Sequence, residues 1–216
     1  MTESDDPRRR LLETAGRIFA EKGFDGATVR DICRQGGVNI AAVNYYFGDK
    51  ERLYIEAVKS AACGSLEAQS LPAWPADTPP VVKLRDFIRV MVGRLMNPDK
   101  PAWHARLMMR ELTEPTAACA EWVEEYVRPH AAVLKDILAE LLPPGTPDFQ
   151  RFLTGFSIMG QCLFYMHCKP VVQLLMGSEY ARITPQVVAG QVTDFSLAAL
   201  GLKPLRRKAE RVGRQE

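Results

Sequence analysis

A set of polar, aromatic and small residues between positions 28 and 50 has the chemistry needed to contact DNA. Asparagine amides suit the edge of adenine, and tyrosine rings and hydroxyl groups suit thymine methyl groups and phosphates. Threonine and lysine at helix N-termini suit phosphates, because the free N–H groups there already favour an anion. The candidate DNA contacts are Thr28, Arg30, Asn39, Ile40, Ala41, Ala42, Asn44, Tyr45, Tyr46 and Lys50.

Short helices joined by tight turns must position these residues. The apolar spacing predicts helices over about 7–22, 28–36 and 39–47, and Gly36-Gly37-Val38 forms a three-residue turn between the last two. This is the layout of a helix-turn-helix, whose second helix enters the major groove with its N-terminal residues at base edges. The small side chains of Ala41 and Ala42 would let that helix approach DNA closely.

Some residues of this region have an alternative role. Ile32, Val43 and Phe47 are expected to form the core rather than to touch DNA. The first 60 residues hold ten Lys or Arg and ten Asp or Glu, so affinity for phosphates must come from a local cluster of cations. Ordinary solvated surface is the alternative for each cation of that cluster, which comprises Arg8, Arg9, Arg10, Arg30, Arg34 and Lys50.

The segment 27–53, ATVRDICRQGGVNIAAVNYYFGDKERL, resembles the DNA-binding head of TetR-family transcriptional regulators. The shared marks are an Ala-Thr helix start, a Gly-Val turn, a short helix ending in two aromatic residues and Phe, and a Lys after the next break. The resemblance covers about residues 8–54, and it implies that Thr28, Tyr46 and Lys50 contact phosphates.

The head departs from the family's common pattern at four positions. Asn44 and Tyr46 stand where Tyr and His are frequent, and Ile40 and Ala41 stand where Lys and Gly are common. Ile40 lacks the charge of lysine, so one phosphate contact is expected to be missing. The resemblance therefore implies how the head binds DNA but not which operator sequence it binds.

Helical spacing continues through the chain, and signals for strands are nearly absent, so the expected fold is all-α. It has a three-helix helix-turn-helix DNA-binding head and a larger helical body, and the resemblance to the TetR family implies that the body binds a ligand and dimerises. The predicted domains are 1–54 for the head, 55–202 for the body and 203–216 for a basic tail, with a connecting helix over about 50–70. The tail is expected to be a soluble end, with DNA contact as the alternative. The helices predicted in the body cover about 81–96, 102–112, 114–141 with a kink at Pro129, 148–168 and 184–200.

The helix predicted at 148–168 is apolar nearly all round. Its uncharged run, 152–168, has 17 residues and includes polar ones, which is short for a membrane span of about 20, so no membrane partner is expected. A second copy could cover it. Helices 148–168 and 184–200 are therefore the expected homodimer pair, packed as a four-helix bundle about a two-fold axis. An internal core helix is the alternative.

Residues 102–168 are rich in Met and aromatic side chains, which suit hydrophobic ligands when a few polar groups accompany them. The segments RELTEP and GQCLFYMHCKP resemble one TetR subgroup linked to efflux or detoxification operons, which implies a xenobiotic-type ligand. For most of these residues the alternative is an ordinary place in the hydrophobic core. For Arg110 and Glu111 the alternative is a structural salt bridge with each other. The candidate ligand contacts are Met91, Trp103, Leu107, Met108, Arg110, Glu111, Trp122, Tyr126, Phe156, Met159, Gln161 and Tyr165.

Together these features predict a ligand-responsive transcriptional regulator. The expected form is a homodimeric repressor that a small hydrophobic or amphipathic effector releases from a palindromic operator in double-stranded DNA. A helical adaptor that binds only protein is the alternative. No nucleophile elbow, P-loop, GxGxxG or HExxH motif occurs, so no enzymatic activity, catalytic residue or cofactor is expected.

The remaining signals concern metals and location. The spacing of Cys162, His167 and Cys168 is poor for one metal ion, so no metal is expected. A thiol switch at Cys162 or Cys168 is an alternative that the sequence leaves open. The net charge of +2 says almost nothing about partners. The five cysteines are scattered and the N-terminus does not resemble a signal peptide, and these two observations favour a reduced cytoplasmic protein.

Overall fold

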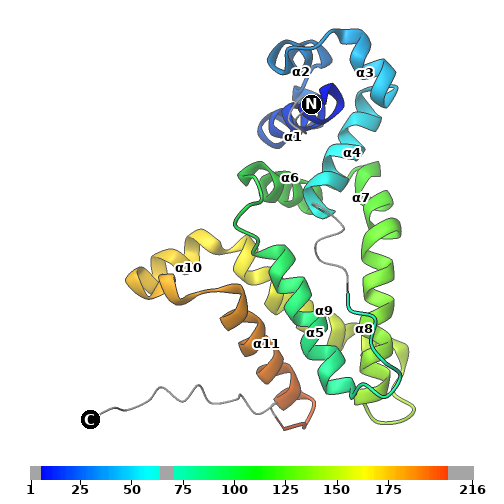
Figure 1. Cartoon of the computed structure of the whole chain (residues 1–216), viewed down its shortest axis with the longest axis vertical. Helices are drawn as coiled ribbons and strands as arrows, with labels where there is room; N and C mark the ends of the chain where they lie inside the picture. Colours follow the sequence, from blue (N-terminus) through cyan, green and yellow to red (C-terminus); the bar gives the residue numbers. More distant parts are fainter. Residues whose placement is uncertain (1–5, 64–70, 204–216) are drawn as a thin grey trace. The chain divides into compact units, whose positions relative to one another are not determined.

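A computed structural model describes residues 6–63 and 71–203, and every regular element among them is a helix, which confirms the all-α prediction (Figure 1). The elements are α1 (Pro7–Gly26), α2 (Val29–Gly36), α3 (Ile40–Phe47), α4 (Lys50–Cys63), α5 (Pro80–Leu95), α6 (Ala102–Thr113), α7 (Ala117–Trp122), the π segment η3 (Val123–Val127), α8 (Arg128–Leu141), α9 (Asp148–His167), α10 (Lys169–Met176), the 3-10 segment η4 (Gly177–Arg182) and α11 (Pro185–Ala199).

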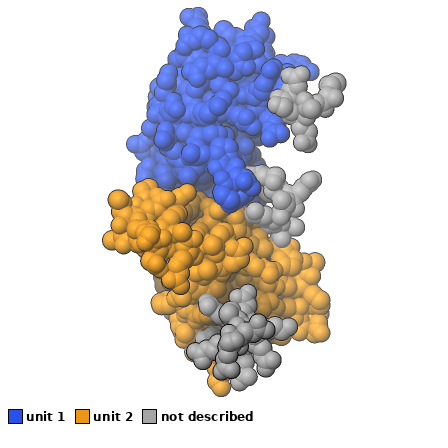
Figure 2. Space-filling model, turned by 60° about the vertical axis from the view of Figure 1, so that its left-hand side comes forward, with its two compact units in different colours: residues 1–70, 97–133 blue, residues 71–96, 134–216 orange. Residues whose placement is uncertain are grey.

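The described residues fall into two compact units (Figure 2). The first unit lies within residues 1–70 and 97–133, and the second unit lies within 71–96 and 134–216. The first unit thus holds α6 and α7 as well as the head, so the predicted domain boundary after residue 54 stays a prediction. The end of the predicted connecting helix, 64–70, and nearly all of the basic tail lie outside the described residues.

Side-chain caps and glycines set the helix ends of the head, as the sequence predicts. The Asp31 N–H donates to Oγ1 of Thr28 at 3.1 Å, and α2 ends in left-handed backbone at Gly37, with φ 64°. The Arg52 N–H donates to Oδ1 of Asp49 at 2.7 Å at the start of α4. These local rules place α2 and α3 in the spacing of a helix-turn-helix.

One apolar core binds the head to α6 and α7 within the first unit. Ile32, Val43 and Phe47 are buried in it, which confirms their predicted core role. The same cluster includes Leu107 of α6 and Ala118 of α7. The helices α1 and α4 therefore pack against α6 in addition to holding α2 and α3.

The second unit is built around α5, which packs against α9 and α11. Its buried face carries Leu84, Phe87 and Ile88 at the helical spacing expected from the sequence. Cys162 of α9 is fully buried in this unit, and burial raises the pKa of its thiol to about 12. The thiol therefore stays protonated and poorly reactive near neutral pH.

Two features of the later helices differ from what the sequence predicts. The predicted kink at Pro129 is instead the π segment η3 just before it, where the Arg128 N–H donates to the carbonyl of Val123. Pro129 has no N–H to offer the carbonyl of Glu125 and its ring crowds that carbonyl, so the chain widens by one residue there. The helix α10 was not predicted, and Pro170 lies in its first turn, where proline is tolerated.

Candidate nucleic-acid interface

The α3 helix buries one face and leaves the other in solvent. Val43 and Phe47 pack into the core of the first unit, whereas Asn44 is exposed. Ile40 is 48% exposed and Tyr45 is 81% exposed, although both are large apolar side chains. An exposed face of this kind on the second helix of a helix-turn-helix is the surface that enters a major groove.

Two of the predicted DNA contacts are also N-caps: Thr28 caps α2 and Asn39 caps α3. Oδ1 of Asn39 accepts a hydrogen bond from the Ala41 N–H at 3.1 Å, and Oγ1 of Thr28 accepts from the Asp31 N–H at 3.1 Å. Both residues are exposed. The Thr28 hydroxyl also hydrogen-bonds the Asp31 carboxylate, whereas Asn39 keeps its amide N–H groups for donation.

The cations around this surface differ in how far other groups engage them. Arg30 is exposed on α2. Lys50, at the first position of α4, has its ammonium 4.4 Å from the centre of the Phe24 ring. Arg34 is paired with Asp31, and hydrogen bonding with Thr28 and the charge of Arg34 lower the pKa of Asp31. Unlike Arg34, Arg30 and Lys50 form no ion pair with a carboxylate among the residues that the structure describes, and their predicted contacts with DNA stay predictions.

A buried carboxylate fastens α4 to α6 and α7. Glu111 is fully buried, and its Oε2 accepts a hydrogen bond from the Tyr54 hydroxyl at 2.7 Å. Its Oε1 accepts from the Thr116 N–H at 2.7 Å, the Thr116 hydroxyl at 2.9 Å and the Cys119 N–H at 3.0 Å. Burial and the adjacent Glu111 carboxylate raise the pKa of Tyr54. Both oxygens of Glu111 are thus engaged by groups of the protein itself.

Exposed ion pairs reinforce the same junction. Arg52 of α4 binds both carboxylate oxygens of Glu121 at 2.8 and 2.9 Å. Lys59 lies 2.8 Å from Glu125 and 3.0 Å from Glu121. Hydrogen bonding to Lys59 is the main cause that lowers the pKa of Glu121. These exposed pairs span about two turns of α4, and they hold it to α7 and η3 only weakly because water and salt screen them.

The candidate ligand contacts are divided between the two units, and their role in ligand binding stays a prediction. Leu107 and Met108 belong to the core of the first unit, and Arg110 pairs with Glu114 at 3.7 Å rather than with Glu111. The first unit holds Trp103, Leu107, Met108, Arg110, Glu111, Trp122 and Tyr126, and the second unit holds Met91, Phe156, Met159, Gln161 and Tyr165.

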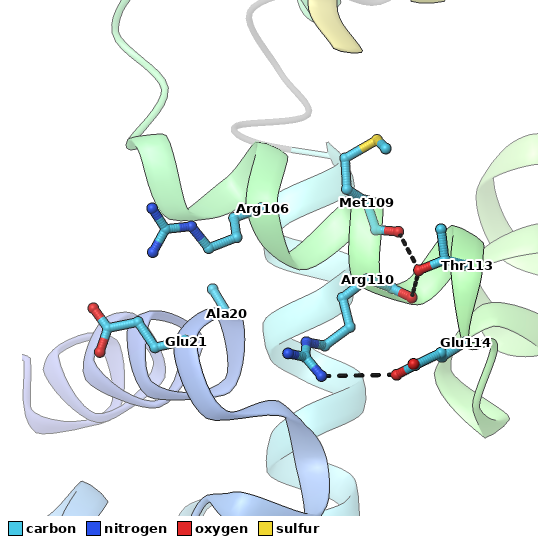
Figure 3. A pocket seen from close by; sticks show the side chains of 7 residues that line it. All are labelled: Ala20, Glu21, Arg106, Met109, Arg110, Thr113 and Glu114. Atoms are coloured by element: carbon cyan, nitrogen blue, oxygen red, sulfur yellow. Dashed lines mark hydrogen bonds and ion pairs between the residues drawn. The ribbon is translucent and has the colours of Figure 1, made fainter. Parts of the chain in front are cut away.

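An open hollow of about 490 Å³ lies between α1 and α6 (Figure 3). Arg110 is its only predicted ligand contact, and its guanidinium lies against Gly23, where an added Cβ would be 2.6 Å from Nη1. The residues lining the hollow are Ala20, Glu21, Arg106, Met109, Arg110, Thr113 and Glu114. Within residues 6–63 and 71–203, no three His, Cys, Asp or Glu side chains gather to hold a metal, and no helix could cross a membrane.

The fold and the exposed α3 surface define an all-α protein with a helix-turn-helix head. Residues 11–57 match the family model described as bacterial regulatory proteins, tetR family. Residues 80–200 match the model described as the C-terminal domain of the HTH-type transcriptional dual regulator CecR. The chain therefore belongs to the TetR family of DNA-binding transcriptional regulators, which are not enzymes, and it carries a C-terminal domain of the CecR type.

Individual relatives agree with this assignment. The chain is 28% identical over 187 residues to the transcriptional dual regulator CecR of Shigella flexneri, covering 81% of this chain and 82% of that one. It is 30% identical over 131 residues to the transcriptional repressor AcnR of Corynebacterium glutamicum, covering 60% of each. The crystal structure of AibR with isovaleryl coenzyme A and operator DNA shares the fold, with a TM-score of 0.61 and 18% identity over 93% of this chain and all of that one.

Proposed function

We propose that the protein is a homodimeric repressor whose two heads, residues 1–54, bind the half-sites of a palindromic operator. The body, residues 55–202, would bind a small hydrophobic or amphipathic effector and release the operator. The observation that carries the DNA-binding part is the exposed face of α3, with Ile40 and Tyr45 in solvent and Val43 and Phe47 buried behind them. Membership of the TetR family favours this function over that of a protein-binding adaptor.

The homodimer is supported by the apolar surface of α9 and α11. These helices pack on each other in the second unit, yet Phe156 is 64% exposed and Phe195 is 59% exposed. An apolar surface shared by two neighbouring helices marks an interaction site rather than ordinary solvent-facing surface. The other exposed large apolar residues of the two helices are Phe149, Phe152, Leu153, Phe164 and Val187. A second copy would bury this surface in a four-helix bundle.

The proposed effector is hydrophobic or amphipathic. The body offers the Met and aromatic side chains that suit such ligands, and AibR, a structural neighbour, was crystallised with isovaleryl coenzyme A, an amphipathic thioester. Acyl-CoA thioesters therefore belong in the first effector screen beside xenobiotic-type compounds. The effector would act by preferring a state in which the heads fit the operator poorly, because only differential affinity shifts an equilibrium.

The test of DNA binding is a gel-shift titration of the full chain on the DNA flanking its own gene, across a salt series. We expect saturable binding that survives competitor DNA and weakens with salt as phosphate contacts are lost. Lys50→Glu should abolish binding while the protein remains dimeric. Binding that disappears on addition of competitor DNA, on every flanking fragment, would contradict the proposal.

A second pair of variants separates the dimer surface from the DNA surface. Phe156→Glu places a charge in the proposed four-helix bundle, so it should give a monomer in analytical ultracentrifugation. Tyr45→Glu is the matched control, because it places the same charge on an exposed aromatic residue of α3. It should leave the dimer intact and weaken DNA binding. A dimeric Phe156→Glu variant would contradict the proposed interface.

The proposed partners are double-stranded operator DNA, the effector and a second copy of the chain, without a membrane. The proposed location is the cytoplasm, where such a regulator meets its operator. The scattered cysteines support this location, because reduced thiols persist there, and Cys33 and Cys162 are buried as free thiols.

A further inference from the structure

The exposed face of α3 carries no charged side chain. From Asn39 to Phe47 the sequence is NIAAVNYYF, and no Lys, Arg, Asp or Glu occurs in it. Direct reading of guanine in the major groove relies most often on Arg or Lys, and reading of cytosine relies on Asp or Glu. This helix therefore lacks the side chains for the usual direct contacts to a G·C pair.

The two asparagines near α3 are not equivalent in the structure. Oδ1 of Asn39 accepts the capping hydrogen bond from the Ala41 N–H at 3.1 Å, so its acceptor is already in use. The exposed side chain of Asn44 makes no hydrogen bond to any part of the chain that the structure describes. Adenine is read by an amide that accepts from N6 and donates to N7 at once. Asn44 has both groups available for that pairing.

Ile40 supplies an apolar group on the same face. It is 48% exposed, and it lies four residues before Asn44, so the two side chains are neighbours on the helix surface. Four residues of α-helix rise about 6 Å, which corresponds to roughly two base-pair steps. The thymine C5-methyl group is the apolar feature of the major groove, and an aliphatic side chain packs against it. Ala41 is exposed beside Ile40 and adds no polar atom.

We infer that α3 reads A·T base pairs within each half-site, with Asn44 paired to an adenine and Ile40 packed on a thymine methyl group. This inference rests on the proposed function, because it names the DNA that the same surface selects. Arg30 lies on α2 and Lys50 on α4. A guanine contact made by either residue would therefore come from a helix other than α3.

The test begins with selection of binding sites by the full chain from a randomised duplex library, followed by single-position changes in the selected site. We expect A·T pairs roughly two base-pair steps apart within each half-site. Changing the adenine read by Asn44 to guanine should weaken wild-type binding by about 5- to 150-fold. Asn44→Ala should bind both sequences with nearly equal affinity, because the discriminating amide is gone.

Deoxyuridine in place of thymidine tests the second contact, since it removes only the methyl group. It should weaken wild-type binding by about fourfold and leave Ile40→Ala unaffected. Asn39→Ser is the matched control for the asparagines: serine keeps the helix cap, so the preference for adenine should persist.

Two outcomes overturn the inference in different ways. The reading of A·T pairs would be refuted if G·C pairs were selected at the positions protected by α3, or if Asn44→Ala still discriminated against guanine. Either outcome would leave the proposed function as a DNA-binding regulator standing. A library that yields no enriched sequence, with binding that salt removes entirely, would refute specific DNA binding and with it the proposed function.

Discussion

The buried Glu111 carboxylate is the sharpest test of how the first unit is held together. Its two oxygens accept hydrogen bonds from the Tyr54 hydroxyl, the Thr116 N–H and hydroxyl, and the Cys119 N–H. In Glu111→Ala these buried donors lose their acceptor at about 1 kcal/mol or more each, and the removed carbon atoms leave unfilled space. We expect the free energy of unfolding to fall by about 3–5 kcal/mol.

Glu111→Gln separates hydrogen bonding from charge. The amide oxygen can replace Oε1 toward Thr116 and Cys119, and the amide N–H₂ group can donate to a Tyr54 hydroxyl that turns to accept. The expected loss is therefore smaller, about 1–2 kcal/mol. Tyr54→Phe leaves Oε2 without its donor and should lose a similar amount.

The assay is urea unfolding followed by circular dichroism at one fixed protein concentration, because the stability of a dimer depends on concentration. The expected loss in Glu111→Ala is a large part of the 5–15 kcal/mol typical of native proteins. If the Ala and Gln variants lose the same amount of stability, the reasoning from hydrogen bonds is wrong. If neither variant loses stability while effector affinity falls, Glu111 is a ligand contact rather than a structural residue.

Five further variants test local backbone, capping and pH effects. Gly93→Ala should raise the free energy of unfolding by about 0.5–1 kcal/mol, because open space surrounds this helical position. Gly23→Ala should lower the free energy of unfolding by about 1–3 kcal/mol, because φ 75° and ψ 179° suit only glycine. Melting temperatures of both variants check the signs. Thr28→Ala should lose about 1 kcal/mol of capping energy and weaken DNA binding, whereas Thr28→Ser should retain both in unfolding and gel-shift titrations. Burial, followed by the charge of Lys100, lowers the pKa of His104 from 6.5 to about 4, so the unfolded state binds more protons than the folded state between these values. Stability should therefore fall as pH falls from 6.5 to 4, and His104→Gln should flatten that part of the urea-midpoint profile.

Local sequence rules predicted the head well because its helix ends depend on neighbouring residues. Thr28, Asn39 and Asp49 each cap the helix that follows, and each was identifiable from its type and its position before an apolar repeat. Pro129 shows where such rules fail. Its type indicated a disturbance, but whether the helix bends or widens into a π segment depends on packing that a single sequence does not contain.

Contacts distant in sequence could not be predicted. Tyr54 and Glu111 are separated by 57 positions, and nothing in either local pattern indicates that they meet. The same limit applies to the asparagines of the interface. Asn39 and Asn44 are equal candidates by type, and only the capping hydrogen bond of Asn39 distinguishes them. The predicted ligand contacts grouped residues by chemistry, and the fold divides them between two units.

The junction between α4 and α6 also bears on how an effector would act in the proposed repressor. Lys50 begins α4, and Tyr54 lies one turn further along, where Glu111 binds it. A helix is stiff over one turn, so a displacement of α6 that carries Glu111 would also carry the end of α4 that bears Lys50, the proposed phosphate contact. The exposed pairs of Arg52 and Lys59 with Glu121 add little to this link, because water and salt screen them. Raising salt should therefore weaken DNA binding through phosphate contacts alone, while the ratio of affinities with and without effector stays constant, because the buried bond that transmits the displacement is not screened.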